Sequence, residues 1–198
     1  MPTAIDPALT ELDVPPLCLR PWRDEDAPAL RDALHESMQS VSRFLSWCHP
    51  DYDLDEARTW IARCRASWLE GNMYDFAILE GGELLGSVGL NDIDAANHRA
   101  NLGYWIRDSV RGRGYTALAA RAVAAFGFEK IELKRIEIVA ATANLASQRC
   151  AEKIGGVCEG VARQRIWIRD QPHDALVYGL LPGDLVQPAA AHQRTISS

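Results

Sequence analysis

The sequence GYWIRDSVRGRGYT at residues 103–116 decides the fold, because an apolar strand-like run enters a turn with two glycines and two arginines. A long segment rich in alanine and leucine follows, which predicts a helix that begins at the turn. Free N–H groups at the start of such a helix can all point at one phosphate, and the glycines let the main chain approach it closely. The arginines add positive charge. The stretch therefore predicts a site for a phosphate-bearing ligand.

Three kinds of phosphate-binding loop can be compared with this turn. A nucleotide-hydrolase loop needs a lysine directly after its second glycine, and none follows here. A dinucleotide fingerprint fits Gly112, Gly114 and Ala117, but that fold places its fingerprint at the first strand, whereas about half of this chain precedes the motif. The pattern for the pyrophosphate arm of coenzyme A, Arg/Gln-x-x-Gly-x-Gly/Ala, matches at Arg111 and Gly114 and departs at Thr116.

The rest of the C-terminal half separates these alternatives. The segment ATANLASQRCAEKIGG at 141–156 is typical of a strand end, an asparagine-capped helix and a glycine stop. It is followed by EGVAR at 159–163 and HDALVYGLL at 173–181, and preceded by LRPW at 19–22 and WCHP at 47–50. Together these segments resemble the GNAT superfamily of acetyl-CoA-dependent N-acyltransferases. The likeness is to the RimJ/RimL-type branch, which includes ribosomal-protein N-terminal acetyltransferases, and it covers residues 17 to 181.

The hydrophobic pattern and the resemblance lead to one fold prediction. Strand-like runs at 17–22, 74–79, 84–91, 100–107, 135–141, 157–169 and 174–181 alternate with helical segments, which indicates an α+β (mixed α/β) sheet. The resemblance implies a GNAT-like, mostly antiparallel sheet of about seven strands, flanked by helices and splayed at the acyl-CoA site. We expect one domain over 17–181, a flexible segment over 1–16 and a flexible tail over 182–198.

The resemblance also assigns residues to acetyl-CoA, the expected cosubstrate. The backbone of the splayed strand would pair with the pantetheine amides, and the glycine turn would cradle the pyrophosphate. The residues expected to bind acetyl-CoA there are Trp105, Ile106, Arg107, Arg111, Gly112, Arg113, Gly114, Tyr115 and Thr116. Asn144 and Ser147 match the family positions near the pantetheine arm and the sulfur, and both are therefore the expected catalytic and cofactor-binding residues of the next helix.

Two family positions depart from the usual pattern. Many relatives carry a tyrosine seven residues after the asparagine, as a proton donor to the thiolate, and here that position is Ala151. Ser147 is therefore the expected group that stabilises the sulfur, through a hydrogen bond or a relayed proton, because a serine hydroxyl is too weak an acid to match a thiol of pKa ~8.5. Many relatives carry a glutamate where Asn101 stands, and an asparagine cannot accept a proton.

The absence of a glutamate at position 101 affects which kind of acceptor amine we expect. Asp92, His49 and His173 are the other candidate bases. A solvated turn explains Asp92 better than a base acting through water does, and a polar loop and a strand-end hydrogen bond adequately explain His49 and His173. At pH 7, deprotonating an α-amine of pKa ~8 costs about 1.4 kcal/mol, against about 4.6 kcal/mol for a lysine. A site without a strong base therefore favours an N-terminal amine over a lysine side chain. Trp47 and Tyr52, in the 46–53 loop, are candidates for lining the acceptor pocket.

Composition limits the remaining functions. The chain has 198 residues, a net charge of −6 and five cysteines without paired spacing. The charge disfavours a nucleic-acid surface, and no apolar run approaches the ~20 residues of a membrane span. Because residues 1–16 lack a basic start followed by an apolar core, we do not expect them to be a signal peptide. We expect reduced thiols, no metal and a cytoplasmic location. The main hypothesis is an acetyl-CoA-dependent N-acetyltransferase that acts on a primary amine such as a ribosomal-protein N-terminus.

Three alternatives remain open from the sequence. The acceptor could be a polyamine or an antibiotic amine. The chain could be a non-catalytic acyl-CoA-binding module, which Asn101 and Ala151 favour and Ser147 disfavours. It could also bind a nicotinamide dinucleotide. Relatives are often dimers, so the resemblance allows a homodimer.

Overall fold

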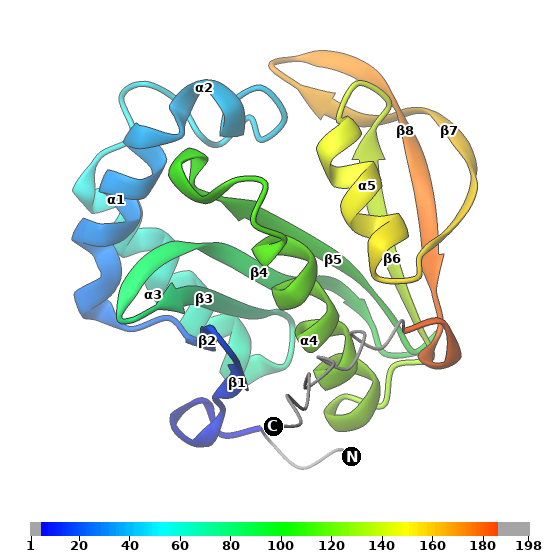
Figure 1. Cartoon of the computed structure of the whole chain (residues 1–198), viewed down its shortest axis with the longest axis horizontal. Helices are drawn as coiled ribbons and strands as arrows, with labels where there is room; N and C mark the ends of the chain where they lie inside the picture. The colour runs from blue at the N-terminus through cyan, green and yellow to red at the C-terminus, as the bar shows by residue number, and fades with distance from the viewer. Residues whose placement is uncertain (1–4, 186–198) are drawn as a thin grey trace, which may run out of the picture.

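Eight strands form one sheet in the computed structural model, which describes residues 5–185. The strand order is β1-β2-β3-β4-β5-β6-β8-β7, and neighbours are antiparallel except for β5 and β6, which are parallel. The sheet, flanked by helices, confirms the predicted α+β fold (Figure 1). The strands are β1 (Leu12–Val14), β2 (Leu17–Pro21), β3 (Tyr74–Glu80), β4 (Glu83–Asp94), β5 (Arg99–Ile106), β6 (Arg135–Ala141), β7 (Val157–Ile168) and β8 (Gln171–Leu180).

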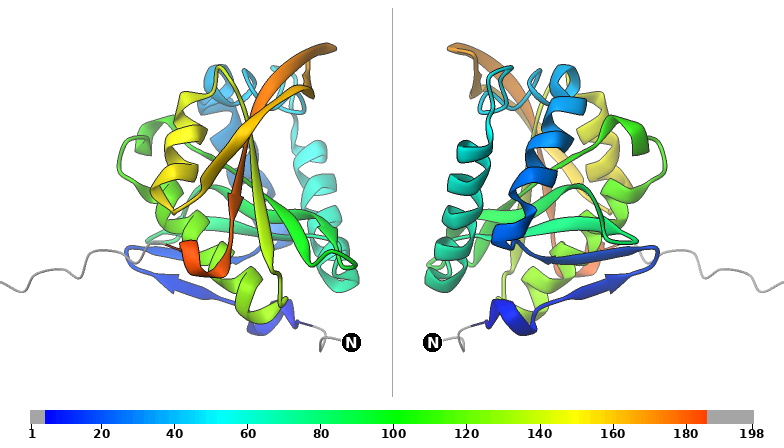
Figure 2. Two further views of the ribbon diagram at one scale, coloured as in Figure 1. Left: turned by 90° about the vertical axis from the view of Figure 1, so that its right-hand side faces the viewer. Right: turned by 90° about the vertical axis from the view of Figure 1, so that its left-hand side faces the viewer.

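The helices connect these strands and cover both faces of the sheet. The α-helices are α1 (Ala27–Glu36), α2 (Met38–Val41), α3 (Leu54–Glu70), α4 (Tyr115–Lys130) and α5 (Leu145–Lys153). Short 3₁₀ turns are η1 (Pro7–Leu9), η2 (Asp24–Asp26), η3 (Asp108–Val110) and η4 (Pro182–Asp184). Helices α4 and α5 lie on one face, and α1 and most of α3 lie on the other (Figure 2).

Side chains of β5 alternate between these two faces and divide the core. Leu102 and Tyr104 pack in the cluster with α4 and α5. Trp105, the next residue, packs in the cluster with α1 and α3. This period of two is what a strand covered on both faces requires. The strand that the glycine turn follows is therefore in contact with both layers of helices.

Helix α3 shows how closely local sequence signals fix the element ends. The Asp53 side chain accepts hydrogen bonds from the backbone N–H groups of Asp55 and Glu56, and the Glu56 side chain accepts one from the Asp53 N–H at 3.1 Å. The helix ends at Gly71, which has a φ of 73°. A D-x-x-E capping box and a glycine in the left-handed region therefore define the two ends of α3.

The sheet begins earlier in the chain than the sequence predicts. Leu12–Val14 lies inside the segment 1–16, which was expected to be flexible, and pairs with Leu17–Leu19 of β2. This pairing adds the eighth strand. Upstream, the Trp68 indole donates to the carbonyl of Ile5 at 3.0 Å. Three residues are too few to show an alternating pattern, so the strand could not be recognised from sequence. The expected C-terminal tail lies, from residue 186 onward, outside the described residues, as do residues 1–4.

The sheet opens between β5 and β6. Only residues 99–101 pair with residues 135–137, and beyond this short parallel seam the two strands have no register with each other. The predicted splay is thereby confirmed. The β6-facing backbone edge of β5, over residues 102–106, is left without a strand partner in the described chain.

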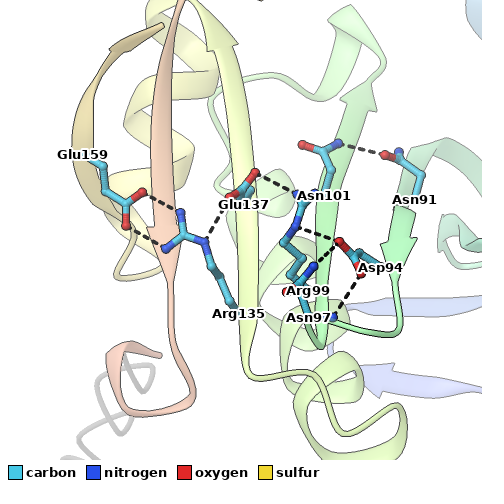
Figure 3. Close-up of polar contacts among 8 residues, drawn as sticks. All are labelled: Asn91, Asp94, Asn97, Arg99, Asn101, Arg135, Glu137 and Glu159. Carbon is cyan, nitrogen blue, oxygen red and sulfur yellow. Dashed lines mark hydrogen bonds and ion pairs between the residues drawn. The ribbon is translucent and has the colours of Figure 1, made fainter.

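An ionic ladder crosses the sheet at the closed end of this opening (Figure 3). Arg135 on β6 pairs with Glu159 on β7 at 2.7 Å and with Glu137 at 3.0 Å. Arg99 on β5 joins Glu137 at 3.5 Å and Asp94 on β4 at 3.3 Å. The Arg135 guanidinium lowers the pKa of the Glu159 carboxyl. The ladder thus ties together the strands on both sides of the seam.

Candidate active site

A groove of about 620 Å³ occupies the opening between β5 and β6. The α4 and α5 side supplies residues of the glycine turn and of the first turns of α5, and the α2 side supplies Ser40, Val41, Phe44 and Leu45. The polar and charged side chains that line it are Ser40, Asn91, Asn101, Tyr104, Arg111, Thr116, Asn144, Ser147, Arg149 and Lys153. The groove therefore passes from one layer of helices to the other through the gap in the sheet.

The glycine turn forms the cationic end of the groove. Gly112 and Gly114 have φ values of 80° and 82°, and Gly114 is the N-cap of α4 with no side chain to cap the first N–H groups. A Cβ on Gly114 would lie 3.2 Å from the Lys153 Nζ, so this ammonium from α5 stands over the helix start. Arg111 is held by Asp108 at 3.1 Å. Uncapped N–H groups, a positive helix end and two cations together form an anion site.

The first turn of α5 forms the wall in the middle of the groove. The Asn144 side chain accepts the Ser147 N–H at 3.1 Å and so caps the helix. The Tyr104 hydroxyl, reaching over from β5, lies 3.1 Å from the Ser147 carbonyl and 3.2 Å from Ser147 Oγ. Burial raises the pKa of the Tyr104 phenol well above its usual value. Burial also raises the pKa of the neighbouring Cys150 thiol to about 11, so both groups are protonated near neutral pH.

The groove lining contains no carboxylate and no imidazole among the described residues. The Asn101 amide donates to the Asn91 Oδ1 at 2.9 Å. These two amides project from adjacent strands β5 and β4 (Figure 3). The groove therefore offers neutral hydrogen-bonding groups and cations, and no group that could hold a protonated amine by charge.

The structure brings most of the sequence-predicted residues together and places three side chains elsewhere. Trp105, Ile106, Arg111, Gly112, Gly114, Thr116, Asn144 and Ser147 all line the groove. The Arg107 guanidinium instead lies between Glu36 and Glu83, at 3.2 Å from each. Arg113 and Tyr115 both face Glu80. These three residues are not among those that line the groove, because their side chains are engaged on other surfaces.

The other candidates from the sequence lie outside the groove lining. Asp92 is exposed at a strand end, and His49 pairs with Glu56 at 3.0 Å. Tyr52 is buried in the α1 and α3 cluster, while Trp47 stacks on Trp60 with ring centres 6.1 Å apart. His173 is exposed on β8. None of these side chains is among the described residues that line the groove.

Sequence reasoning missed Tyr104, Arg149 and Lys153 as members of the site. Tyr104 stands in the decisive stretch, but its direction depends on how β5 alternates. Arg149 and Lys153 lie four residues apart, on one face of α5. That spacing was the signal available for the pair, yet only the packing of α5 beside the glycine turn shows which face meets the groove.

Metal centres and membrane spans are both absent from the described part of the chain. No group of three or more His, Cys, Asp or Glu side chains within residues 5–185 is placed to hold a metal ion. In the same range, no helix is both long enough and apolar enough to span a bilayer.

Comparisons with known proteins agree with the geometry. A sequence model described as "Acetyltransferase (GNAT) domain" matches residues 16–157. The chain is 30% identical over 166 residues to the Bacillus subtilis protein named "Putative ribosomal N-acetyltransferase YdaF", covering 83% of this chain and 91% of that one. It is 30% identical over 103 residues to the Escherichia coli ribosomal-protein-serine acetyltransferase, covering 52% and 58%. The fold matches a RimL ribosomal L7/L12 α-N-protein acetyltransferase in complex with coenzyme A, with a TM-score of 0.82, 22% identity and coverage of 87% and 98%.

Proposed function

The chain belongs to the GNAT acetyltransferase family, and from that premise we propose that it transfers an acetyl group from acetyl-CoA to the α-amine of a protein N-terminus. The observation that carries this proposal is the groove between β5 and β6, with cations at one end and no anionic side chain in its described lining. The acetyltransferase activity follows from the family. The identity of the acceptor is the step that we add.

The residues of the groove fit acetyl-CoA. The uncapped start of α4, Arg111 and Lys153 would hold the phosphates, since charge-assisted hydrogen bonds to phosphate are the strong ones. The unpaired edge of β5 over residues 102–106 would pair with the pantetheine amides as a neighbouring strand does. Asn144 and Ser147 line the stretch between these two regions.

The acetyl thioester supplies an activated carbonyl carbon, and the protein supplies position and proton control. A groove that fixes both reactants gains rate by orientation. Ser147 would donate a hydrogen bond to the sulfur, and Asn91 and Asn101 would accept from or donate to the amine. Because these amides carry no charge, they do not favour the ammonium form, and the acceptor enters as the neutral amine.

Charge also distinguishes the classes of acceptor. Polyamines and aminoglycosides carry several ammonium groups, and Arg111, Arg149 and Lys153 would repel them. A peptide N-terminus carries one titratable amine with a pKa near 8 and is followed by neutral backbone. The groove therefore suits a peptide better than a polycation.

The direct test is acetyl-CoA-dependent thiol release with a panel of acceptors. We expect release with peptides that begin with a free α-amine, and little release with spermidine or an aminoglycoside. An N-acetylated peptide that carries one lysine is the matched control for the α-amine. Efficient turnover of a polyamine, with none of any peptide, would overturn the proposed acceptor.

The pH dependence gives a second prediction. Below the pKa of the peptide amine, about 8, kcat/KM should rise about tenfold per pH unit and then level off, because no protein base in the described lining titrates there. At pH 7 the neutral fraction of an α-amine exceeds that of a lysine by about 250-fold, so we expect a preference of order one hundredfold. Initial rates on the two matched peptides between pH 6 and 9 measure both. An inflection near pH 5 would reveal a carboxylate base and contradict the scheme.

The extent and the location of the enzyme complete the proposal. We assign the catalytic unit to the single domain predicted over 17–181, extended at its start by β1. All five cysteines are free thiols, of which Cys48, Cys64 and Cys150 are buried and Cys158 is exposed. Free thiols fit a reducing compartment, and we therefore place the enzyme in the cytoplasm.

A further inference from the structure

A buried phenol stands in the groove beside the residue expected to face the sulfur. Tyr104 projects from β5 toward the α4 and α5 layer, and its hydroxyl reaches the first turn of α5, at 3.1 Å from Ser147 O and 3.2 Å from Ser147 Oγ. Both residues line the groove. No step described so far uses this phenol. A buried tyrosine hydroxyl normally has a hydrogen-bond partner, and here the partner is Ser147.

The phenol comes from the strand because α5 does not provide one. Ala151 lies one helical turn after Ser147 on the same face of α5, is fully buried and carries no polar group. A helical side chain leans toward the helix N-terminus, so a residue at 151 would cover the turn that holds Ser147. The Tyr104 hydroxyl is bonded to that same turn.

We propose that Tyr104 is a positioning residue that aims the Ser147 hydroxyl at the acyl-CoA sulfur; the assignment rests on the proposed function. A serine hydroxyl rotates freely, so on its own it can turn its single proton away from the sulfur. The Tyr104 hydroxyl donates to the Ser147 carbonyl at 3.1 Å and has Ser147 Oγ within reach at 3.2 Å. When its proton turns from the carbonyl to Ser147 Oγ, it occupies an acceptor site of that oxygen and leaves the serine proton directed into the groove. The Ser147 hydroxyl can then donate its hydrogen bond to the sulfur.

Ser147 and Tyr104 together account for the proton that the departing sulfur receives. The amine nitrogen bonds to the acetyl carbon and loses one proton to water, while the carbon–sulfur bond breaks and the sulfur keeps the electron pair. Ser147 Oγ gives its proton to that sulfur, Tyr104 restores the proton of Ser147, and water restores the proton of Tyr104. No oxidant, reductant or further reactant is needed. The raised pKa of Tyr104 keeps the phenol protonated, and thus a donor, across the assay range.

The experiment compares two ligands on two variants. Coenzyme A and desulfo-coenzyme A differ only at the sulfur, so their affinity ratio at pH 9, measured by calorimetry, reports what the protein does to the thiolate. We expect wild-type protein to favour coenzyme A by about tenfold, and Tyr104→Phe to lose that preference while binding desulfo-coenzyme A normally. Tyr178→Phe is the matched control, because its hydroxyl also contacts α5, 3.2 Å from Glu152 Oε1 and away from the groove.

Kinetics separate positioning from a structural role. Tyr104→Phe should lower kcat about 10- to 30-fold with the KM for acetyl-CoA within about twofold, and it should have almost no further effect in a Ser147→Ala background. Equal loss of affinity for both ligands, or full additivity of the two substitutions, would overturn the proposal. Wild-type protein that binds neither ligand would instead refute the proposed function, so the two failures are distinguishable.

Discussion

Replacement of Lys153 by glutamate is expected to weaken coenzyme A binding about a hundredfold. The Lys153 Nζ stands over Gly114, at the start of α4, where the main-chain N–H groups have no side-chain cap. A charge-assisted bond to phosphate contributes on the order of 2 to 3 kcal/mol, which corresponds to this factor, and the new carboxylate would also repel the anion. Calorimetric titration with coenzyme A measures the change.

The control for this charge reversal is Lys130→Glu. Lys130 is exposed in the last turn of α4, at the opposite end of that helix from the glycine turn, so the same change in net charge should leave affinity within about twofold. The difference between the two variants should shrink as salt is added, because screening weakens attraction to the phosphates. Unchanged affinity in Lys153→Glu would remove Lys153 from the phosphate site.

Replacement of Gly86 by alanine is expected to cost about 3 kcal/mol of unfolding free energy, the largest stability effect that we predict. Gly86 lies in β4 opposite Ile106, and an added Cβ would lie 2.3 Å from the Trp105 carbonyl oxygen and 2.9 Å from the Ile106 Cα. These are backbone atoms of the central sheet, so rotating a side chain cannot relieve the contact. β5 would have to move away from β4.

Thermal and urea unfolding measure this loss, which corresponds to a fall in Tm of roughly 10 °C for a chain of this size. Gly183→Ala is the matched substitution, because nothing lies within 4 Å of the position that its new methyl group would take, and it should change stability by less than about 0.5 kcal/mol. Since Trp105 and Ile106 also line the groove, any Gly86→Ala protein that folds should bind coenzyme A more weakly. Wild-type stability in Gly86→Ala would contradict the close approach of β4 and β5.

Features encoded by neighbouring residues could be predicted from the sequence. The capping box at Asp53 and Glu56, the stop at Gly71, the glycine turn and the Asn144 cap each depend on a few adjacent positions. The local backbone chemistry of these residue types is nearly independent of the rest of the chain. The fold class and most of the groove followed from them, together with the family resemblance.

The side-chain positions that the sequence did not predict depend on contacts between segments that are far apart in the chain. Lys153 reaches Gly114 only because α5 packs beside the start of α4, and Tyr104 meets Ser147 only across the opening of the sheet. Arg107 stands beside the predicted loop, yet its side chain turns to Glu36 on α1. In each case tertiary packing selects the partner, and a linear pattern does not contain that information.

Because β5 and β6 pair over a short seam only, the stability of the sheet should depend on whether acetyl-CoA is bound. Three residue pairs and the ionic ladder join the two parts of the sheet, and the gap beyond them is the place where the pantetheine arm would lie. In the proposed complex, the reactant consumed in each cycle is also a temporary piece of the scaffold. Bound acetyl-CoA would therefore stabilise the folded sheet, and product release would remove that stabilisation. Amide hydrogen exchange along β5 would then slow as the acetyl-CoA concentration rises.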